Sequence, residues 1–147
     1  MIFGEIETGD AEGAILAHSI RAGTLSFRKG RKLSPADVAG LQAAGIERIV
    51  AIRLEPGDVP EDESAAVLAR ALAGPGLSVA EPFTGRANLY AEADGILVYD
   101  RERLDRINLL DEALTVATLA TFETVAARQM IATVKVIPFA APRTSLD

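Results

Sequence analysis

The stretch SPADVAGLQAAGIERIVAIRL, residues 34–54, decides the fold class because it specifies a helix, a tight turn and a strand in close succession. The hydroxyl of Ser34 is suited to cap a helix N-terminus, and Pro35 is suited to the first helical position. Asp37 then supplies a carboxylate in the first turn, where the helix dipole favours negative charge. The spacing predicts a helix that begins at Pro35.

The end of this helix and the start of the next element are equally well marked. Val38 and Leu41 share one helix face and are expected to point into the core. Gly45 can adopt the left-handed conformation that closes a helix. The β-branched run over 46–54 then predicts a strand, so the unit is a helix, a tight turn and a strand.

Turn residues and short apolar runs divide the rest of the chain into further elements. The second predicted helix starts at Pro60 and runs to about Ala73. Its first turn contains three carboxylates, which complement the helix dipole. Its apolar stripe consists of Val67, Leu68, Ala71 and Leu72. A third helix is expected after Asp100, with Leu104 and Ile107 facing inward. Strands are predicted at residues 3–6, 14–17, 24–27, 77–80, 95–99, 113–119 and 130–139.

Two of the intervals between predicted strands are turns too short for a parallel crossover. We therefore expect an α+β domain with a small mixed, partly barrel-like β-sheet and covering helices, in preference to a doubly wound parallel sheet. The length of 147 residues fits one domain or two very small ones. Because 26 residues are alanine, the layers of the core should be thin and closely packed.

The charge balance limits the classes of partner. With 15 Lys and Arg against 21 Asp and Glu, the chain has a net charge of −6, which repels phosphate backbones and anionic lipid surfaces. Nucleic acid is therefore not an expected partner. The longest stretches without a charged residue, residues 71–80 and 113–122, are far shorter than the roughly 20 residues that cross a bilayer. We expect no membrane partner.

The absence of cysteine excludes disulfides, thiolate metal sites and cysteine nucleophiles. The first residues have neither the basic nor the apolar region of a secretory signal, and we expect a cytoplasmic protein. His18 is the only imidazole, so no metal site is expected. An arrangement of His18 with a hydroxyl and an acid stays open, but no nucleophile elbow is present and no catalytic residue is assigned.

One loop has the chemistry of a ligand contact. Thr84, Gly85, Arg86 and Asn88 bring a hydroxyl, a flexible backbone donor, a guanidinium and a carboxamide within five residues. This set suits an anion or a polar heterocycle. Turn chemistry alone explains the same residues, so both interpretations stay open.

Cationic residues offer two further candidates. Lys135 lies inside a predicted strand with Thr133 on its face, and it could meet an anionic ligand or block pairing at a sheet edge. The basic segment over residues 28–32 could grip phosphate or form a solvated hairpin tip. We retain Lys135 as a candidate and assign the basic segment no ligand.

Several stretches resemble a known family. They are residues 10–19, 27–37, 54–59, 84–89 and 129–139. They are similar to the N-terminal region of bacterial molybdopterin-binding proteins of the molybdenum cofactor pathway, which are related to molybdopterin molybdotransferases. Some of these proteins are fused to a cofactor cytidylyltransferase-like domain. The resemblance extends from about Phe3 to Pro142, and the phrase from Lys29 to Ile46 is similar to a segment of the molybdotransferases themselves.

The resemblance implies that residues 1–142 form a single N-terminal module and that 143–147 form a linker or tail. Such a module is expected to be non-catalytic and to hold molybdopterin or position a downstream MogA/MoaB-like domain. The enzymatic groups would belong to the parent protein, either molybdotransferase-like or cytidylyltransferase-like. This chain alone is expected to carry no cofactor of its own. Thr84, Gly85, Arg86, Asn88 and Lys135 are the residues expected to contact the phosphate and the polar pterin.

Two other readings stay open. The chain could be a scaffold or a homodimerisation module without a ligand, joined through apolar faces at Val67 and Leu72 or at Val134 and Val136. It could also be a small enzyme built around His18 and a distant carboxylate. A cofactor-pathway protein is the partner in the first reading, and a second copy is the partner in the dimer reading.

Overall fold

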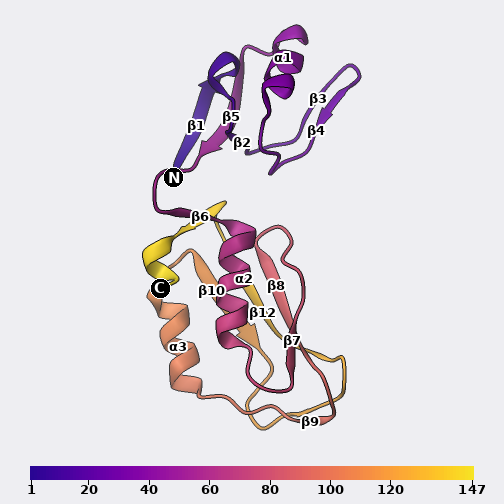
Figure 1. Ribbon diagram of the computed structural model, residues 1–147, viewed down its shortest axis with the longest axis vertical. Coiled ribbons are helices and arrows are strands. Elements are labelled where there is room, and N and C mark those ends of the chain that lie inside the picture. The colour runs from indigo at the N-terminus through magenta and orange to yellow at the C-terminus, as the bar shows by residue number, and fades with distance from the viewer. The chain divides into compact units, whose positions relative to one another are not determined.

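The computed structural model describes all 147 residues, which form two compact units, Met1–Pro56 and Gly57–Asp147. The sequence pattern allowed two very small domains, whereas the family resemblance implied one module over residues 1–142. Three helices and many short strands confirm the α+β class (Figure 1). The strands form several small sheets, and each sheet is open. None of the helices is long and apolar enough to cross a lipid bilayer.

Unit 1 consists of a small antiparallel sheet, a helix and a hairpin. The sheet has the order β1-β5-β2, and its strands are β1 (Ile2–Glu7), β2 (Ile15–Leu16) and β5 (Arg48–Arg53). The other elements are the 3-10 turn Thr8–Asp10, the helix α1 (Pro35–Ala43), and the hairpin of β3 (Ile20–Ala22) and β4 (Leu25–Phe27). Leu16, Leu41 and Ile49 lie in a buried apolar cluster between these elements.

The start of α1 has the predicted cap. The Ser34 hydroxyl accepts a hydrogen bond from the Asp37 N–H at 3.2 Å, and the Asp37 carboxylate accepts one from the Ser34 N–H at 3.1 Å. Arg31 donates two further bonds to Asp37, at 3.0 and 2.8 Å, and its guanidinium lies 4.7 Å from the centre of the Phe27 ring. Part of the basic segment is therefore bound within the unit. Gly45 follows the helix with φ +73°, as predicted.

Unit 2 is built on a four-stranded antiparallel sheet with the order β10-β12-β8-β7 (Figure 1). Its strands are β7 (Leu77–Val79), β8 (Arg86–Ala91), β10 (Leu114–Thr118) and β12 (Met130–Val136). Two helices accompany it, α2 (Glu61–Leu72) and α3 (Arg101–Leu110). Two strand pairs and a 3-10 turn complete the unit: β6 (Asp58–Pro60) with β13 (Ala140–Pro142), β9 (Gly95–Ile96) with β11 (Thr124–Val125), and Arg143–Ser145.

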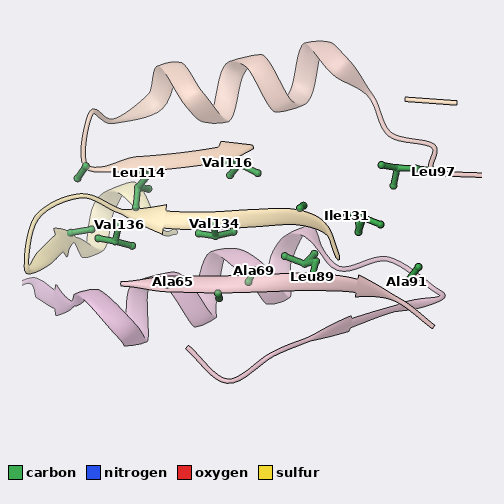
Figure 2. Packing of buried hydrophobic residues seen from close by; sticks show 14 residues of the cluster. Ala65, Ala69, Leu89, Ala91, Leu97, Leu114, Val116, Ile131, Val134 and Val136 are labelled. Carbon is green, nitrogen blue, oxygen red and sulfur yellow. The ribbon is translucent and has the colours of Figure 1, made fainter. Parts of the chain in front are cut away.

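The core of unit 2 lies between α2 and one face of the sheet. Ala65 and Ala69 of α2 belong to the same buried cluster as Leu89 of β8 and Val134 of β12 (Figure 2). Because alanine side chains are short, they let the helix approach the sheet closely, and dense packing follows. The core is thin and rich in alanine, as the composition indicated.

The predicted apolar stripe of α2 is therefore partly wrong. Val67 and Ala71 are exposed, and Leu68 and Leu72 are half-buried, whereas the alanines at 65 and 69 face the sheet. The sequence prediction ranked side chains by hydrophobicity and so chose the larger ones, but close approach of the helix to the sheet favours the smaller ones. The bounds of the helix itself agree with the prediction.

The strand β8 was missed. Residues 84–88 were predicted as a polar loop, but only Thr84 and Gly85 form a turn, and Arg86 already begins β8. The strict alternation of buried and less buried residues from Arg86 to Ala91 is the pattern of a strand with one face in the core. The glycine and the polar residues concealed this alternation in the sequence.

The third helix agrees with its prediction, and the last residues form a short 3-10 turn. Asp100 caps α3 by accepting the Arg103 N–H at 3.1 Å, and Leu104 and Ile107 pack against the core, as predicted. Residues 143–147, predicted as a linker or tail, include a 3-10 turn from which the Ser145 hydroxyl donates to Asp111. This bond and the Ala113 N–H lower the pKa of the Asp111 carboxyl.

We expect Asp37→Asn to flatten the acid dependence of stability. The bonds from Arg31, followed by the Ser34 N–H, lower the pKa of Asp37 from 3.8 to about 2. Because the folded pKa lies below the unfolded one, this stabilisation is complete above pH 3.8 and is lost as the pH falls through about 2. The variant should lose about 1 kcal/mol at neutral pH.

Urea unfolding at a series of pH values tests this expectation. The matched control is Asp105→Asn, because Asp105 has only an exposed pair with Arg101 at 3.9 Å. If the wild type and Asp37→Asn lost equal stability between pH 4 and pH 2, the assigned role of the carboxylate would be wrong.

Candidate functional site

Three of the five candidate residues, Arg86, Asn88 and Lys135, lie on the face of the four-stranded sheet that points away from α2. Arg86 and Asn88 alternate along β8 with the buried Ala87 and Leu89, and Lys135 likewise alternates with buried valines along β12. Since successive side chains of a strand point to opposite faces, the polar members share the outer face. We call this surface, defined by Arg86, Asn88, Tyr90, Thr133, Lys135 and Thr115, the outer polar face.

The register of the strands sets the neighbours on this face. Lys135 of β12 pairs directly with Arg86 of β8 on one side and with Thr115 of β10 on the other. Thr133 pairs with Asn88. Directly opposed residues have Cβ atoms about 4.5–5.5 Å apart, so the two cations are adjacent and an amide and a hydroxyl lie in the next row.

Thr84 and Gly85 form the turn at one end of this face. Phe83 and Arg86 exchange two backbone hydrogen bonds, of 2.8 and 3.1 Å, across these two residues. Both turn residues have positive φ, 50° and 70°, as a tight two-residue hairpin requires. The Lys135 Nζ donates to the Thr84 carbonyl at 2.6 Å. The structure therefore brings all five predicted residues together.

Gly85 is held where no side chain fits. A Cβ at this position would lie 2.8 Å from the Glu61 Oε2 and 2.8 Å from the Val136 carbonyl oxygen. Its N–H donates to the Asp62 Oδ1 at 2.7 Å, and its carbonyl accepts the Val136 N–H at 2.7 Å. The start of α2 and the end of β12 thus fix the turn, and Asp62 has a structural role besides its charge at the helix N-terminus.

The electrostatics of this face differ from those of the whole chain. The strands β7, β8, β10 and β12 contain Arg86 and Lys135 but no aspartate or glutamate, although the chain has a net charge of −6. Arg86 is exposed and forms no ion pair, and the contact of the Lys135 Nζ is with a carbonyl. Like charges directly opposed on neighbouring strands are destabilising. An anion placed between them would relieve this repulsion.

The edge-strand interpretation of Lys135 is wrong. Strand β12 lies between β10 and β8, so its backbone is paired on both sides and needs no lysine to block pairing. The Lys135 side chain instead reaches the turn, where its Nζ bonds the Thr84 carbonyl. The carbonyl of Thr84 uses one of its three donors, and two are left for a ligand or for solvent.

Sequence reasoning missed three further polar residues of the site. Thr133 was placed on the Lys135 face but not named as a contact, and Tyr90 and Thr115 were not considered. The Asn88 Nδ2 and the Tyr90 hydroxyl are 3.4 Å apart, whereas the Asn88 Oδ1 and the Thr133 Oγ1 are enclosed without a hydrogen-bond partner. Such unpartnered atoms are rare in folded proteins. The alternation from Arg86 to Tyr90 was the signal that could have identified Tyr90.

Other candidates are placed elsewhere. His18 is exposed and lines neither the cleft of about 620 Å³ in unit 2 nor the cleft of about 430 Å³ in unit 1, which argues against an enzyme built around it. No cluster of three or more His, Cys, Asp or Glu side chains is arranged to hold a metal ion. Val134 and Val136 are completely buried within unit 2 and are not free to join a second copy, whereas Val67 is exposed.

The two clefts also lie apart from the predicted residues. The larger has a volume of about 620 Å³ and lies within unit 2, between α3, the end of α2 and the core side of the sheet. The smaller, of about 430 Å³, lies in unit 1 beside Thr8 and Gln42. None of the five predicted contact residues lines either cleft, so the outer polar face is a surface site.

Comparison with known proteins gives one match. The family model of a domain of unknown function, DUF8806, matches residues 5–53. These residues lie within unit 1, so the match does not include the outer polar face. No curated protein and no solved structure matches the chain.

We expect Gly85→Ala to destabilise unit 2 by about 2 kcal/mol or more, because the added Cβ meets backbone and carboxylate oxygens and the residue has φ +70°. The matched control is Gly76→Ala, since Gly76 has φ +80° but nothing within 4 Å of an added Cβ. The control should lose about 1 kcal/mol. Equal losses in thermal unfolding would show that the close approach at Gly85 is unimportant.

Proposed function

We propose that this chain is a non-catalytic domain of the molybdenum cofactor pathway that holds an anionic, phosphate-bearing pterin on the outer polar face. The observation that carries the proposal is the direct pairing of Arg86 with Lys135 on strands that contain no acidic residue. Two adjacent cations suit a phosphate group, and the fork of a guanidinium can donate two parallel hydrogen bonds to it.

The next row of the face suits a polar ring. Asn88 and Thr133 are half-buried polar residues of this row, Tyr90 lies beside them, and amide and hydroxyl groups can both donate and accept hydrogen bonds. Molybdopterin combines a phosphate with a polar pterin, so the residues present fit both parts of that molecule. The resemblance of the chain to N-terminal regions of molybdopterin-binding proteins supports the same assignment.

In this proposal the domain supplies binding and positioning, and a partner supplies the chemistry. The partner is a downstream MogA/MoaB-like domain or another protein of the cofactor pathway, and the site of action is the cytoplasm. Arg86 and Thr115 are exposed and the other residues of the face are half-buried, which supports a role in presenting the ligand, because a shallow surface leaves one side of a bound molecule accessible.

A scaffold or homodimerisation module without its own ligand is the alternative. The observation that favours it is the exposed Val67 on α2, and the burial of Val134 and Val136 restricts any junction to other surfaces. Light scattering distinguishes the two functions. A stable dimer without ligand binding would favour the alternative.

We expect the full chain to release heat when titrated with a phosphorylated pterin, and Arg86→Ala to weaken the affinity by about tenfold or more, because a charge-assisted hydrogen bond is lost. Arg70→Ala is the matched control, since Arg70 is an exposed residue of α2 and lies outside the outer polar face. Binding should weaken with added salt.

Two further titrations separate the parts of the ligand. Inorganic phosphate alone should bind weakly and compete, and an unphosphorylated pterin should bind more weakly than the phosphorylated form. If Arg86→Ala and the wild type gave the same affinity, the outer polar face would not be the binding site.

A further inference from the structure

The larger cleft of unit 2 has the size and the walls of a small-molecule site. Its volume of about 620 Å³ falls within the roughly 300–1,000 Å³ typical of ligand pockets. Leu89 and Val116 on the core side of the sheet line it, and Leu104 and Ile107 of α3 form one wall. This cleft is on the opposite side of the sheet from the outer polar face.

Small residues explain why the cleft is open. Ala71, Ala91 and Ala132 line it together with Gly74 and Gly76, and none of them extends far enough to fill the space. The helix α3 has no fully buried residue, and Leu104 and Ile107 are its two side chains packed against the core. The cleft opens to the surface, so a ligand can enter the space that these small residues leave.

The charged residues of the cleft differ in their bonding. The Asp94 carboxylate accepts the Ala127 N–H at 2.8 Å, and the Asp100 carboxylate accepts the Arg103 N–H at 3.1 Å. The guanidinium of Arg103 is the single cation of the lining, is exposed, and forms neither an ion pair nor a side-chain hydrogen bond. Each carboxylate thus accepts a backbone N–H and keeps its charge, whereas the guanidinium has all its donors free for a ligand.

Arg103 is placed to meet a ligand that lies on the apolar wall. It occupies the same helix as Leu104 and Ile107, within one turn, and all three line the cleft. A polar group at the edge of an apolar pocket fixes the orientation of a ligand, while the apolar surface supplies most of the affinity. The arrangement therefore matches a molecule with an apolar body and one anionic end.

We propose that this cleft binds an amphipathic small molecule, with an aliphatic or aromatic body against Leu89, Val116 and Leu104 and a carboxylate or sulfonate at Arg103. The site is independent of the proposed pterin surface in position and in chemistry. It gives unit 2 a second ligand, whose apolar body distinguishes it from the polar pterin.

Fluorescence titration of the full chain with anilinonaphthalene sulfonate, an anionic aromatic probe, tests the proposal. We expect saturable binding of one probe per chain, and competition by dodecanoate that exceeds competition by the uncharged dodecanol. Arg103→Glu should weaken probe binding by about tenfold or more, since an attraction becomes a repulsion. Arg106→Glu is the matched control, because Arg106 is exposed on α3 and does not line the cleft.

A second pair of variants tests the volume of the cleft. Ala132→Leu should fill the floor of the cleft and remove saturable binding. If this buried substitution prevents folding, Ala93→Phe is the alternative, because Ala93 is exposed at the mouth and a larger side chain there should block entry without disturbing the core. Arg86→Ala should bind the probe as the wild type does. Unchanged binding in Arg103→Glu or in Ala93→Phe, or binding that does not saturate, would overturn the proposal.

Discussion

Unit 2 depends on the burial of β12 between two neighbouring strands and beneath the alanine face of α2. Val134 and Val136 have no exposed surface, and the period of two along a strand then sends Thr133 and Lys135 to the other side. A shift of one residue would bring a charged ammonium into the core, which is costly without a partner. The same packing that stabilises the sheet therefore fixes the outer polar face.

Much of the fold could be predicted where a local signal decides the structure. The cap at Ser34, the left-handed Gly45 and the cap at Asp100 depend on neighbouring residues alone, and all three were predicted. The buried face of α2 was not, because the distance between helix and sheet decides whether alanine or valine is buried there. The strand β8 was missed because Gly85 and Asn88 resemble a loop, although the residues alternate regularly.

The candidate site could be predicted as a set of residues but not as an arrangement. The chemistry of Arg86, Asn88 and Lys135 is visible in the sequence, and Lys135 is separated from Arg86 by nearly fifty positions. Their adjacency arises from the register between β8 and β12, which long-range packing determines. For the same reason the contribution of Thr133 and the wall of the larger cleft could not be read from the pattern of one segment.

The pairing of β6 with β13 has a consequence for how unit 2 can be connected to other chains. These strands are the first and nearly the last elements of the unit, and the Arg143 N–H donates to the Gly57 carbonyl at 2.8 Å. The points where the chain enters and leaves unit 2 are thus side by side, as in domains that tolerate circular permutation. Unit 2 has the geometry of a cassette that could be inserted into a surface loop of a host protein without separating the two ends of that loop.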